Sequence, residues 1–172
     1  MPELENLSKS ELKTIYDGDQ KDRAEKLWEK DPQLMAKRDS TRLKRILELV
    51  ENNRLKKPAD FLHAAMILQH GSEIRHYELA REFAKKAADQ GYTPETGEVD
   101  PFWLAAAAKD RSLMSQGKPQ RYGTQSRKDV KDGPWYLYQV DPSITDEERA
   151  RFHVRPLSEL IKRIDDLNSR KE

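Results

Sequence analysis

The chain has 172 residues and no cysteine, which is the size of one ordinary domain and excludes zinc ribbons, thiol nucleophiles and disulfide scaffolds. Charged residues make up 37% of it and the formal net charge is only +1, so no general nucleic-acid-binding surface is predicted. No apolar run approaches a membrane span, and the first residues lack the layout of a signal peptide. We therefore expect a single helical domain over residues 1–172, with a core over about 8–168, in the cytoplasm and without membrane association.

The N-terminal part of the chain carries two helical patterns. A first helix is expected to begin at Ser8, with Glu11 completing a capping box, and to break at Gly18 before it resumes over residues 23–28. A second pattern begins with Pro32 at a first helical position, and its apolar residues repeat at i, i+3, i+4 and i+7 as far as residue 50. This second helix is therefore expected to bury one face.

The middle of the chain is predicted to supply the buried helices. Residues 58–70 are apolar around nearly the whole helical circumference, which indicates a central helix. A helix capped by Ser72 follows and ends before Gly91, and another opens at Pro101, where an alanine run lets neighbouring helices approach closely. These successive hairpins are similar in character to tetratricopeptide or Sel1-type repeats, whose packed faces also carry small residues.

Helical periodicity disappears over residues 118–144. This stretch contains a turn at Gly133 followed by aromatic and β-branched residues, so we expect a long loop with one short β-hairpin. Thr145, which precedes three acidic residues, is expected to cap a short helix, and Pro156 to start the last one. The sequence thus predicts an all-α bundle of six or seven helices with one long aromatic loop.

Two histidines are unusual because they lie in the buried helix. His63 and His70 are seven residues apart, which places them about 20° apart on one face and two turns from each other. An unsatisfied buried polar group costs about 1 to 3 kcal/mol, so each ring is expected to have a partner. Metal binding is a minor alternative, since helical metal-ligand pairs prefer i, i+4 spacing. We therefore expect neither a metal nor a cofactor.

Candidate partners for these rings come from stretches that are distant in sequence. Asp110 and Arg111 end the alanine-rich helix, and a carboxylate there could hold a histidine in one tautomer. Gly123 permits a tight turn or close approach to a ligand. The other candidates are Asp19, Gln20 and Arg23 of the DQKDR stretch, Gln69 beside His70, and Gln120, Arg121, Tyr122, Thr124 and Gln125 around Gly123.

Each candidate also has a purely structural interpretation. The histidines can be satisfied core residues, and Asp110 with Arg111 can form a buried ion pair that ties helices to the loop. The DQKDR residues can serve capping and pairing at the glycine break, and the QRYGTQ stretch can be a turn packed by its tyrosine. His76 and His153 lie among charged residues and are expected at the surface.

Basic residues are dense in two stretches, 37–57 and 118–131, which could attract an anionic ligand or nucleic acid. A solvated face is the simpler interpretation, and no known single-strand module accompanies the aromatics of residues 135–138. The absence of a phosphate loop and of a dinucleotide fingerprint disfavours nucleotide-dependent chemistry. A nucleic-acid partner is therefore not expected, and the sequence does not identify a protein partner.

Four strings of the sequence carry a resemblance. They are DQKDR, FLHAAMILQHG, WLAAAAKDRSLMSQGKPQRYGTQ, and the acidic DPSITDEERARF leading into VRPLSEL. Together they resemble a family of bacterial domains of unknown function, over about residues 10–165. The resemblance implies a small, mostly helical, soluble module, and it implies no activity, cofactor or catalytic assignment.

We interpret the buried helix, the end of the alanine-rich helix, the DQKDR stretch and the QRYGTQ loop as converging on one polar pocket. In this hypothesis His63 or His70 transfers the proton, Asp110 orients it and Tyr122 supplies a hydrogen bond. The residues that bind the substrate are Asp19, Gln20, Arg23, Gln69, Arg111, Gln120, Arg121, Thr124 and Gln125.

The ligand of such a pocket would be an anionic or carbonyl-containing small molecule, and the reaction would be cofactor-independent hydrolysis or lyase-type proton abstraction. The alternative is a non-enzymatic, helical-repeat-like interaction module. In that case the same polar residues would only lock the helices and the loop together.

Overall fold

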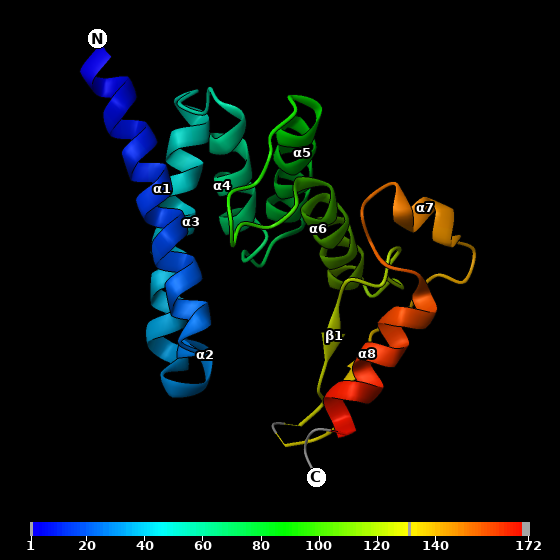
Figure 1. Cartoon of the computed structure of the whole chain (residues 1–172). Helices are drawn as coiled ribbons and strands as arrows, with labels where there is room; N and C mark the ends of the chain where they lie inside the picture. The colour runs from blue at the N-terminus through cyan, green and yellow to red at the C-terminus, as the bar shows by residue number, and fades with distance from the viewer. Residues whose placement is uncertain (1, 131, 170–172) are drawn as a thin grey trace.

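A row of helices crosses the molecule from the N-terminal pair to a smaller C-terminal part in the computed structural model, which describes residues 2–130 and 132–169 (Figure 1). Over these residues there are eight helices and one two-stranded sheet, so the predicted all-α bundle is confirmed. The elements are α1 (Pro2–Ala24), α2 (Leu27–Lys30), α3 (Pro32–Glu51), α4 (Pro58–Leu68), α5 (Ile74–Asp89), α6 (Pro101–Ser115), β1 (Ser126–Arg127), β2 (Tyr136–Leu137), α7 (Asp146–Ala150) and α8 (Leu157–Ser169).

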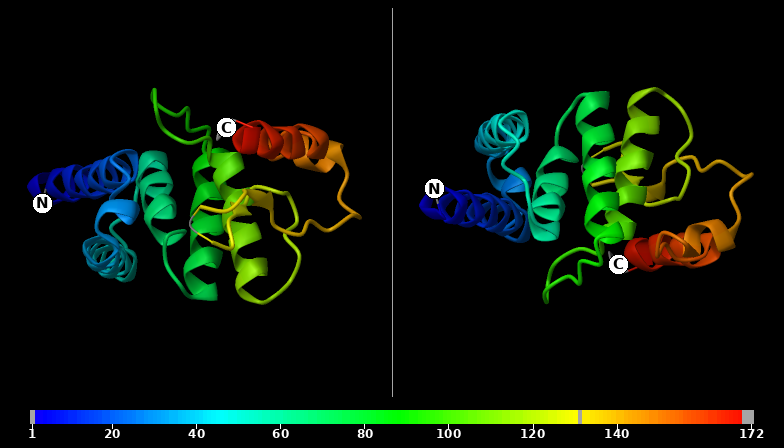
Figure 2. Two further views of the ribbon diagram at one scale, coloured as in Figure 1. Left: turned by 90° about the horizontal axis from the view of Figure 1, so that it is seen from below. Right: turned by 90° about the horizontal axis from the view of Figure 1, so that it is seen from above.

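The order of the helices in space follows their order in the chain. In both views of Figure 2, α1 and α3 lie at one end, α4, α5 and α6 follow side by side, and α7 with α8 lies at the far end. Consecutive helices of the middle group pack on each other, and the most extensive contacts join α5 to α6 and α4 to α5. This arrangement of hairpins places the N-terminal pair against α4.

α4 is the centre of the hydrophobic core, as its sequence predicts. Every residue from Phe61 to Leu68 is buried, and α4 contacts α1, α3, α5 and α6. A helix without a polar face is stable only when other elements cover it on all sides, which explains the central position of α4.

The alanine run of α6 lies where two helices meet. Ala105 to Ala108 are almost completely inaccessible, and α5 contributes the buried residues Ala80, Ala84 and Ala87. Small side chains on both helices let the backbones approach closely, which explains the extensive contact between α5 and α6.

Three predicted helix boundaries are wrong. α1 begins before Ser8 and continues through Gly18, and α5 begins at Ile74 with Glu73 rather than Ser72 as its N-cap residue. A single glycine inside a helix costs only about 1 kcal/mol, which packing against α3 can offset. Glu11 lies inside α1 and accepts a 2.5 Å hydrogen bond from Arg45 Nε of α3 instead of completing a cap.

The long loop and its hairpin are confirmed. β1 and β2 pair antiparallel, and an isolated bridge joins Gln120 to Val140. Gly123 is buried at φ +88°, and a Cβ there would lie 3.0 Å from Leu160 Cδ1 of α8, so the residue must be glycine on both counts. Thr145 caps α7 as expected, through a 3.2 Å bond from Glu148 N. No helix in the described part of the chain has both the length and the apolar character to cross a membrane.

Candidate functional site

The polar residues singled out in the sequence form three separate networks and not one pocket. One network joins α1, α3 and α4 around His70, a second joins α4 to the α5–α6 connection around His63, and a third joins α6 to the following loop around Asp110. The expected convergence is therefore wrong, and each network has its own chemistry.

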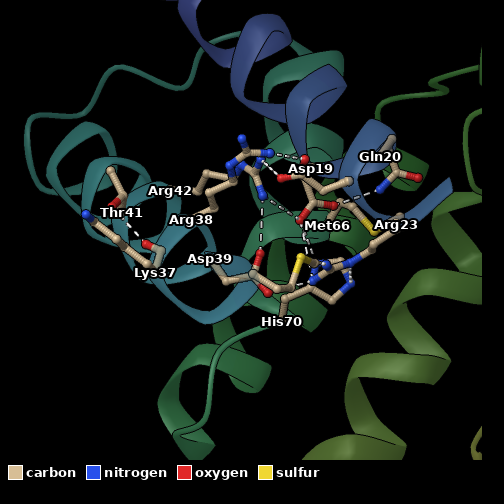
Figure 3. A network of polar contacts seen from close by, with 12 residues as sticks. Asp19, Gln20, Arg23, Lys37, Arg38, Asp39, Thr41, Arg42, Met66 and His70 are labelled. Carbon is tan, nitrogen blue, oxygen red and sulfur yellow. Dashed lines mark hydrogen bonds and ion pairs between the residues drawn. The ribbon is translucent and has the colours of Figure 1, made fainter. Parts of the chain in front are cut away.

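The first network contains a histidine held between a carboxylate and a guanidinium (Figure 3). His70 Nδ1 lies 3.1 Å from Asp19 Oδ1, and Arg23 Nε donates to His70 Nε2 at 3.0 Å. Because a guanidinium can only donate, Nε2 must accept, and Nδ1 therefore carries the proton and donates it to Asp19. Gln20 donates to the other oxygen of Asp19 at 2.9 Å, which completes the orientation of the pair.

The environment of this pair favours a neutral imidazole beside an ionised carboxylate. Burial lowers the pKa of His70 below 6.5, and the positive charges of Arg23 and Arg111 add to this effect, which outweighs the pull of Asp19. Burial alone would raise the pKa of Asp19, but hydrogen bonds from His70 and Gln20 and the Arg23 charge hold it below its usual value. The result is an oriented, uncharged histidine at neutral pH.

A second layer of charge, which the sequence interpretation missed, comes from α3 (Figure 3). Arg23 Nη2 donates to Asp39 at 3.1 Å, and Arg42 connects Asp39, at 3.3 Å, to Asp22 of α1. Arg38 also donates to Asp22, at 2.5 Å. The expectation of a solvated basic face is wrong for Arg42, whose side chain is only 13% exposed.

A hollow of about 540 Å³ opens beside this network. Arg111 reaches it from α6, and the Nε atom of Arg111 is buried with no hydrogen-bond partner. Burial lowers the pKa of this guanidinium, yet an arginine stays charged in proteins, and Asp39, the carboxylate of the hollow, pairs with Arg23 and Arg42 rather than with Arg111. Its lining residues are Arg23, Trp28, Met35, Asp39, His70 and Arg111.

Gln69 lies beside the hollow without being one of its lining residues. Its side-chain amide nitrogen lies 3.0 Å from Met66 Sδ and 3.5 Å from His70 Nε2. Of the predicted substrate-binding residues, the structure therefore gathers Asp19, Gln20, Arg23, Gln69 and Arg111 around His70.

The second network gives His63 a partner of its own. His63 Nε2 lies 2.8 Å from Glu98, which also accepts a 2.6 Å bond from the hydroxyl of Tyr92. The ring of Tyr16 in α1 lies 4.5 Å from the imidazole. Burial raises the pKa of Glu98, but the bonds from Tyr92 and His63 outweigh it and lower the pKa. His63 thus fastens the α5–α6 connection to α4 and does not share a site with His70.

The third network is centred on Asp110, which holds the loop and not a histidine. Asp110 is fully buried, and its two oxygens accept hydrogen bonds from the backbone N–H groups of Arg121, Tyr122 and Thr124 at 2.7 to 2.9 Å. The hydroxyl of Thr124 donates a fourth bond at 2.7 Å. The predicted orienting role of Asp110 towards a histidine is therefore corrected: it shapes the turn around Gly123.

Gln120 and Gln125 close the same turn and are not near the hollow's lining. The buried Gln120 amide donates to the carbonyls of Gln125 and Tyr138, and its oxygen accepts from Gln125 N at 2.9 Å. The side chain of Gln125 donates to Thr124 Oγ1. These contacts give the QRYGTQ stretch its structural interpretation, as a turn locked by its own side chains.

Arg121 and Tyr122 connect the turn to α7. Arg121 pairs with Glu148, and the buried ring of Tyr122 packs 4.8 Å from Phe152. Arg149, which the sequence interpretation missed, is buried and donates to the carbonyl of Tyr122 at 3.2 Å. Tyr122 is thus a packing residue, and it does not lie with His63 or His70 as its predicted catalytic role requires.

The two remaining histidines differ in their surroundings. His153 is exposed, as expected, and its Nδ1 lies 3.0 Å from Asp100. His76 was expected at the surface and is buried, because its ring covers Gly71, where a Cβ would lie 2.5 Å from Nδ1. Within residues 2–130 and 132–169, no three histidine, aspartate or glutamate side chains form a group suited to a metal ion.

Stability is expected to fall in two stages as the pH is lowered. Below pH 6.5 the unfolded chain takes up a proton at His70 that the folded protein resists, and near pH 4 the lowered pKa values of Asp19, Asp22 and Glu98 act in the same direction. A His70→Gln variant should lose the upper stage and keep the part of the lower stage that Asp22 and Glu98 supply, measured by thermal melts from pH 8 to pH 3. An unchanged profile above pH 5 in this variant would contradict the assignment.

The resemblance of the four sequence strings to a family of bacterial domains stays a prediction. The chain matches no family model and has no significant similarity to a curated protein or to a solved structure.

Proposed function

We propose that the protein binds a small anionic molecule in the hollow between Arg23 and Arg111. One observation carries the proposal: Arg111 lines this hollow, and its guanidinium, whose buried Nε has no hydrogen-bond partner, forms no ion pair with a carboxylate of the described residues. A buried cation without a partner destabilises a protein, so an anion that completes its hydrogen bonds is the natural ligand.

The balance of charge around the hollow supports an anion. The network beside it contains three arginines and three aspartates, which pair with one another. Arg111 is not part of these pairs and adds a positive charge that the network does not neutralise. The Arg111 guanidinium can present a planar fork of donors to a phosphate or a carboxylate, and Arg23, although already hydrogen-bonded to His70 and Asp39, lines the same hollow.

A second candidate function is proton transfer by His70 to or from the bound anion. It is favoured by the hydrogen bond from Nδ1 to Asp19, which makes Nε2 the basic nitrogen. That nitrogen already accepts a bond from Arg23, so the ligand would have to draw the Arg23 guanidinium away before His70 could act. Binding is therefore the better supported function, and hydrolase or lyase chemistry is the extension that depends on it.

The interaction-module alternative is supported only for the other two networks. His63 pairs with Glu98 of the α5–α6 connection, and both oxygens of Asp110 accept hydrogen bonds from the following loop, as a structural lock requires. The hollow at Arg111 differs because its cation lacks such partners. We therefore assign ligand binding to the hollow at Arg111 and a structural role to the networks around His63 and Asp110.

Titration calorimetry with inorganic phosphate and with acetate tests the proposal. The Arg111→Met variant is expected to bind either anion at least about ten-fold more weakly than the unmodified protein, because a charge-assisted hydrogen bond is lost. The matched control is Arg155→Met, which removes the same charge from an exposed side chain of the C-terminal part. Its affinity should stay within about two-fold.

Two results would contradict the proposal. Equal weakening in both variants would mean that the anions respond only to the overall charge of the protein. Absence of binding at concentrations of about 10 mM would mean that the hollow does not select anions.

A further inference from the structure

A second hollow adjoins the first and has a different character. It has a volume of about 370 Å³ and lies between α2 and the hairpin that contains β1 and β2. Trp28 lines both hollows, so the two are neighbours across one indole ring. The residues of the second hollow are Trp28, Glu29, Pro32, Lys128 and Trp135.

Both tryptophans of the second hollow are held in place by unusual local structure. Trp28 lies in a helix of four residues that follows Lys26, whose φ of 54° is left-handed, and it remains 46% exposed. Trp135 is fixed by Asn168 of α8, which accepts from its N–H at 2.7 Å and donates to its carbonyl at 2.8 Å. A half-exposed indole on a constrained turn has no role in the core.

The residues of the second hollow are suited to bind a planar aromatic ring. Two indoles from separate parts of the chain line it, and the ammonium of Lys128 lies 4.9 Å from the Trp135 ring. Aromatic rings pack against indoles without requiring a particular hydrogen-bond pattern, so such a site accepts planar groups of many kinds.

We propose that the two hollows form one site for a ligand in which a planar aromatic ring is joined to a phosphate or carboxylate. The anionic group lies between Arg23 and Arg111, and the ring lies against Trp28 on the side that faces Trp135. This inference rests on the proposed function of the first hollow. A nucleoside monophosphate is one example of such a ligand, and arginine side chains rather than a phosphate loop would hold its phosphate.

Calorimetric titration with four probes separates the two parts of the site. The probes are inorganic phosphate, adenosine, adenosine 5′-monophosphate and 2-naphthoate, which together vary the anion and the ring. Both ring-bearing anions are expected to bind about ten-fold to a hundred-fold more tightly than phosphate, because stacking on an indole contributes this much to affinity.

The Trp135→Leu variant should remove this advantage and leave the affinity for phosphate unchanged, since Trp135 lines only the second hollow. Trp28→Leu should remove the advantage as well, but Trp28 also lines the anion hollow, so its phosphate affinity is not used as a control. Phe102→Leu is the matched control, since Phe102 packs on His153 outside both hollows and its loss should change neither affinity. If phosphate binds but the ring-bearing anions bind no better, the inference is overturned and the proposed function stands.

Other outcomes also discriminate. Loss of the advantage in the Phe102→Leu variant as well would overturn the inference, since the tryptophans would then have no special part. If phosphate and ring-bearing anions both fail to bind, the proposed function and this inference fail together. If only adenosine 5′-monophosphate binds more tightly than phosphate, the site is specific for phosphates. If 2-naphthoate shows an equal increase in affinity, the site also accepts carboxylates. Both results support the inference.

Discussion

Replacement of Arg111 by methionine is expected to make the protein more resistant to heat while it removes anion binding. The Arg111 guanidinium is largely buried, and its Nε has no acceptor, so the folded protein bears an uncompensated desolvation cost. Methionine keeps much of the side-chain volume and needs no partner. The free energy of unfolding should rise by about 1 kcal/mol, and the Tm by about 2 to 4 °C, in the absence of added anions.

The matched control for this variant is another buried arginine. Arg149 donates hydrogen bonds to the carbonyls of Tyr122 and Ile144 and to Asp146, although its Nη2 atom also lacks a partner. Arg149→Met should therefore lower the free energy of unfolding by about 2 to 4 kcal/mol. A loss of stability of similar size in both variants would show that Arg111 is a structural residue and not a ligand-binding one.

Replacement of Asp110 by alanine is expected to cause the largest loss of stability among single changes at the predicted site. Three backbone N–H groups and the Thr124 hydroxyl would lose their acceptor inside the protein. Unsatisfied buried donors cost about 1 to 3 kcal/mol each, so a total loss of about 3 to 5 kcal/mol is expected after partial relaxation. Denaturant unfolding at neutral pH measures this loss.

The exposed Asp89 of α5 provides the control for Asp110, because Asp89→Ala removes the same charge and should change stability by less than about 0.5 kcal/mol. Anion affinity, measured at a temperature where the Asp110→Ala variant is still folded, should be unchanged. A variant with normal stability and lost binding would return Asp110 to the site from which the structure separates it.

Much of the fold follows from patterns within single segments. The unbroken apolar surface of residues 61–68 predicts a central helix, the alanine run of α6 predicts close packing, and the change of periodicity at residue 118 predicts the loop. The continuation of α1 through Gly18 was not predictable in the same way. Whether a glycine ends a helix depends on the packing of its neighbours, here α3, and not on the glycine alone.

The candidate site was less predictable because its partners lie on separate helices. The sequence interpretation identified Asp19, Arg23 and His70 as unusual, yet their contact depends on how α1 packs against α4. Asp39 and Arg42 resembled a solvated helical face, since a charge pattern does not reveal which polar side of a helix meets another helix. Arg149 is concealed in the same way within an acidic helix.

The partner of Asp110 was predicted wrongly, because two sets of hydrogen-bond donors compete for this carboxylate. The carboxylate was expected to orient a histidine about 40 residues away, and it binds backbone groups only 11 to 14 residues further along the chain. A short loop costs less conformational entropy to close than a long one, so the nearer donors have an advantage. They are also three N–H groups that would otherwise be buried without partners.

The walls of the anion hollow come from several helices of the row. Arg23, Met35 and Asp39 belong to α1 and α3, whereas His70 follows the end of α4 and Arg111 belongs to α6. A ligand bound in this hollow would stabilise the packing of α1 and α3 against the rest of the chain, because the ligand binds only the folded form. The lifetime of the protein would then depend on how much of it has ligand bound. In a cell with little ligand, more of the protein would unfold and be degraded, so its abundance would follow the concentration of the ligand.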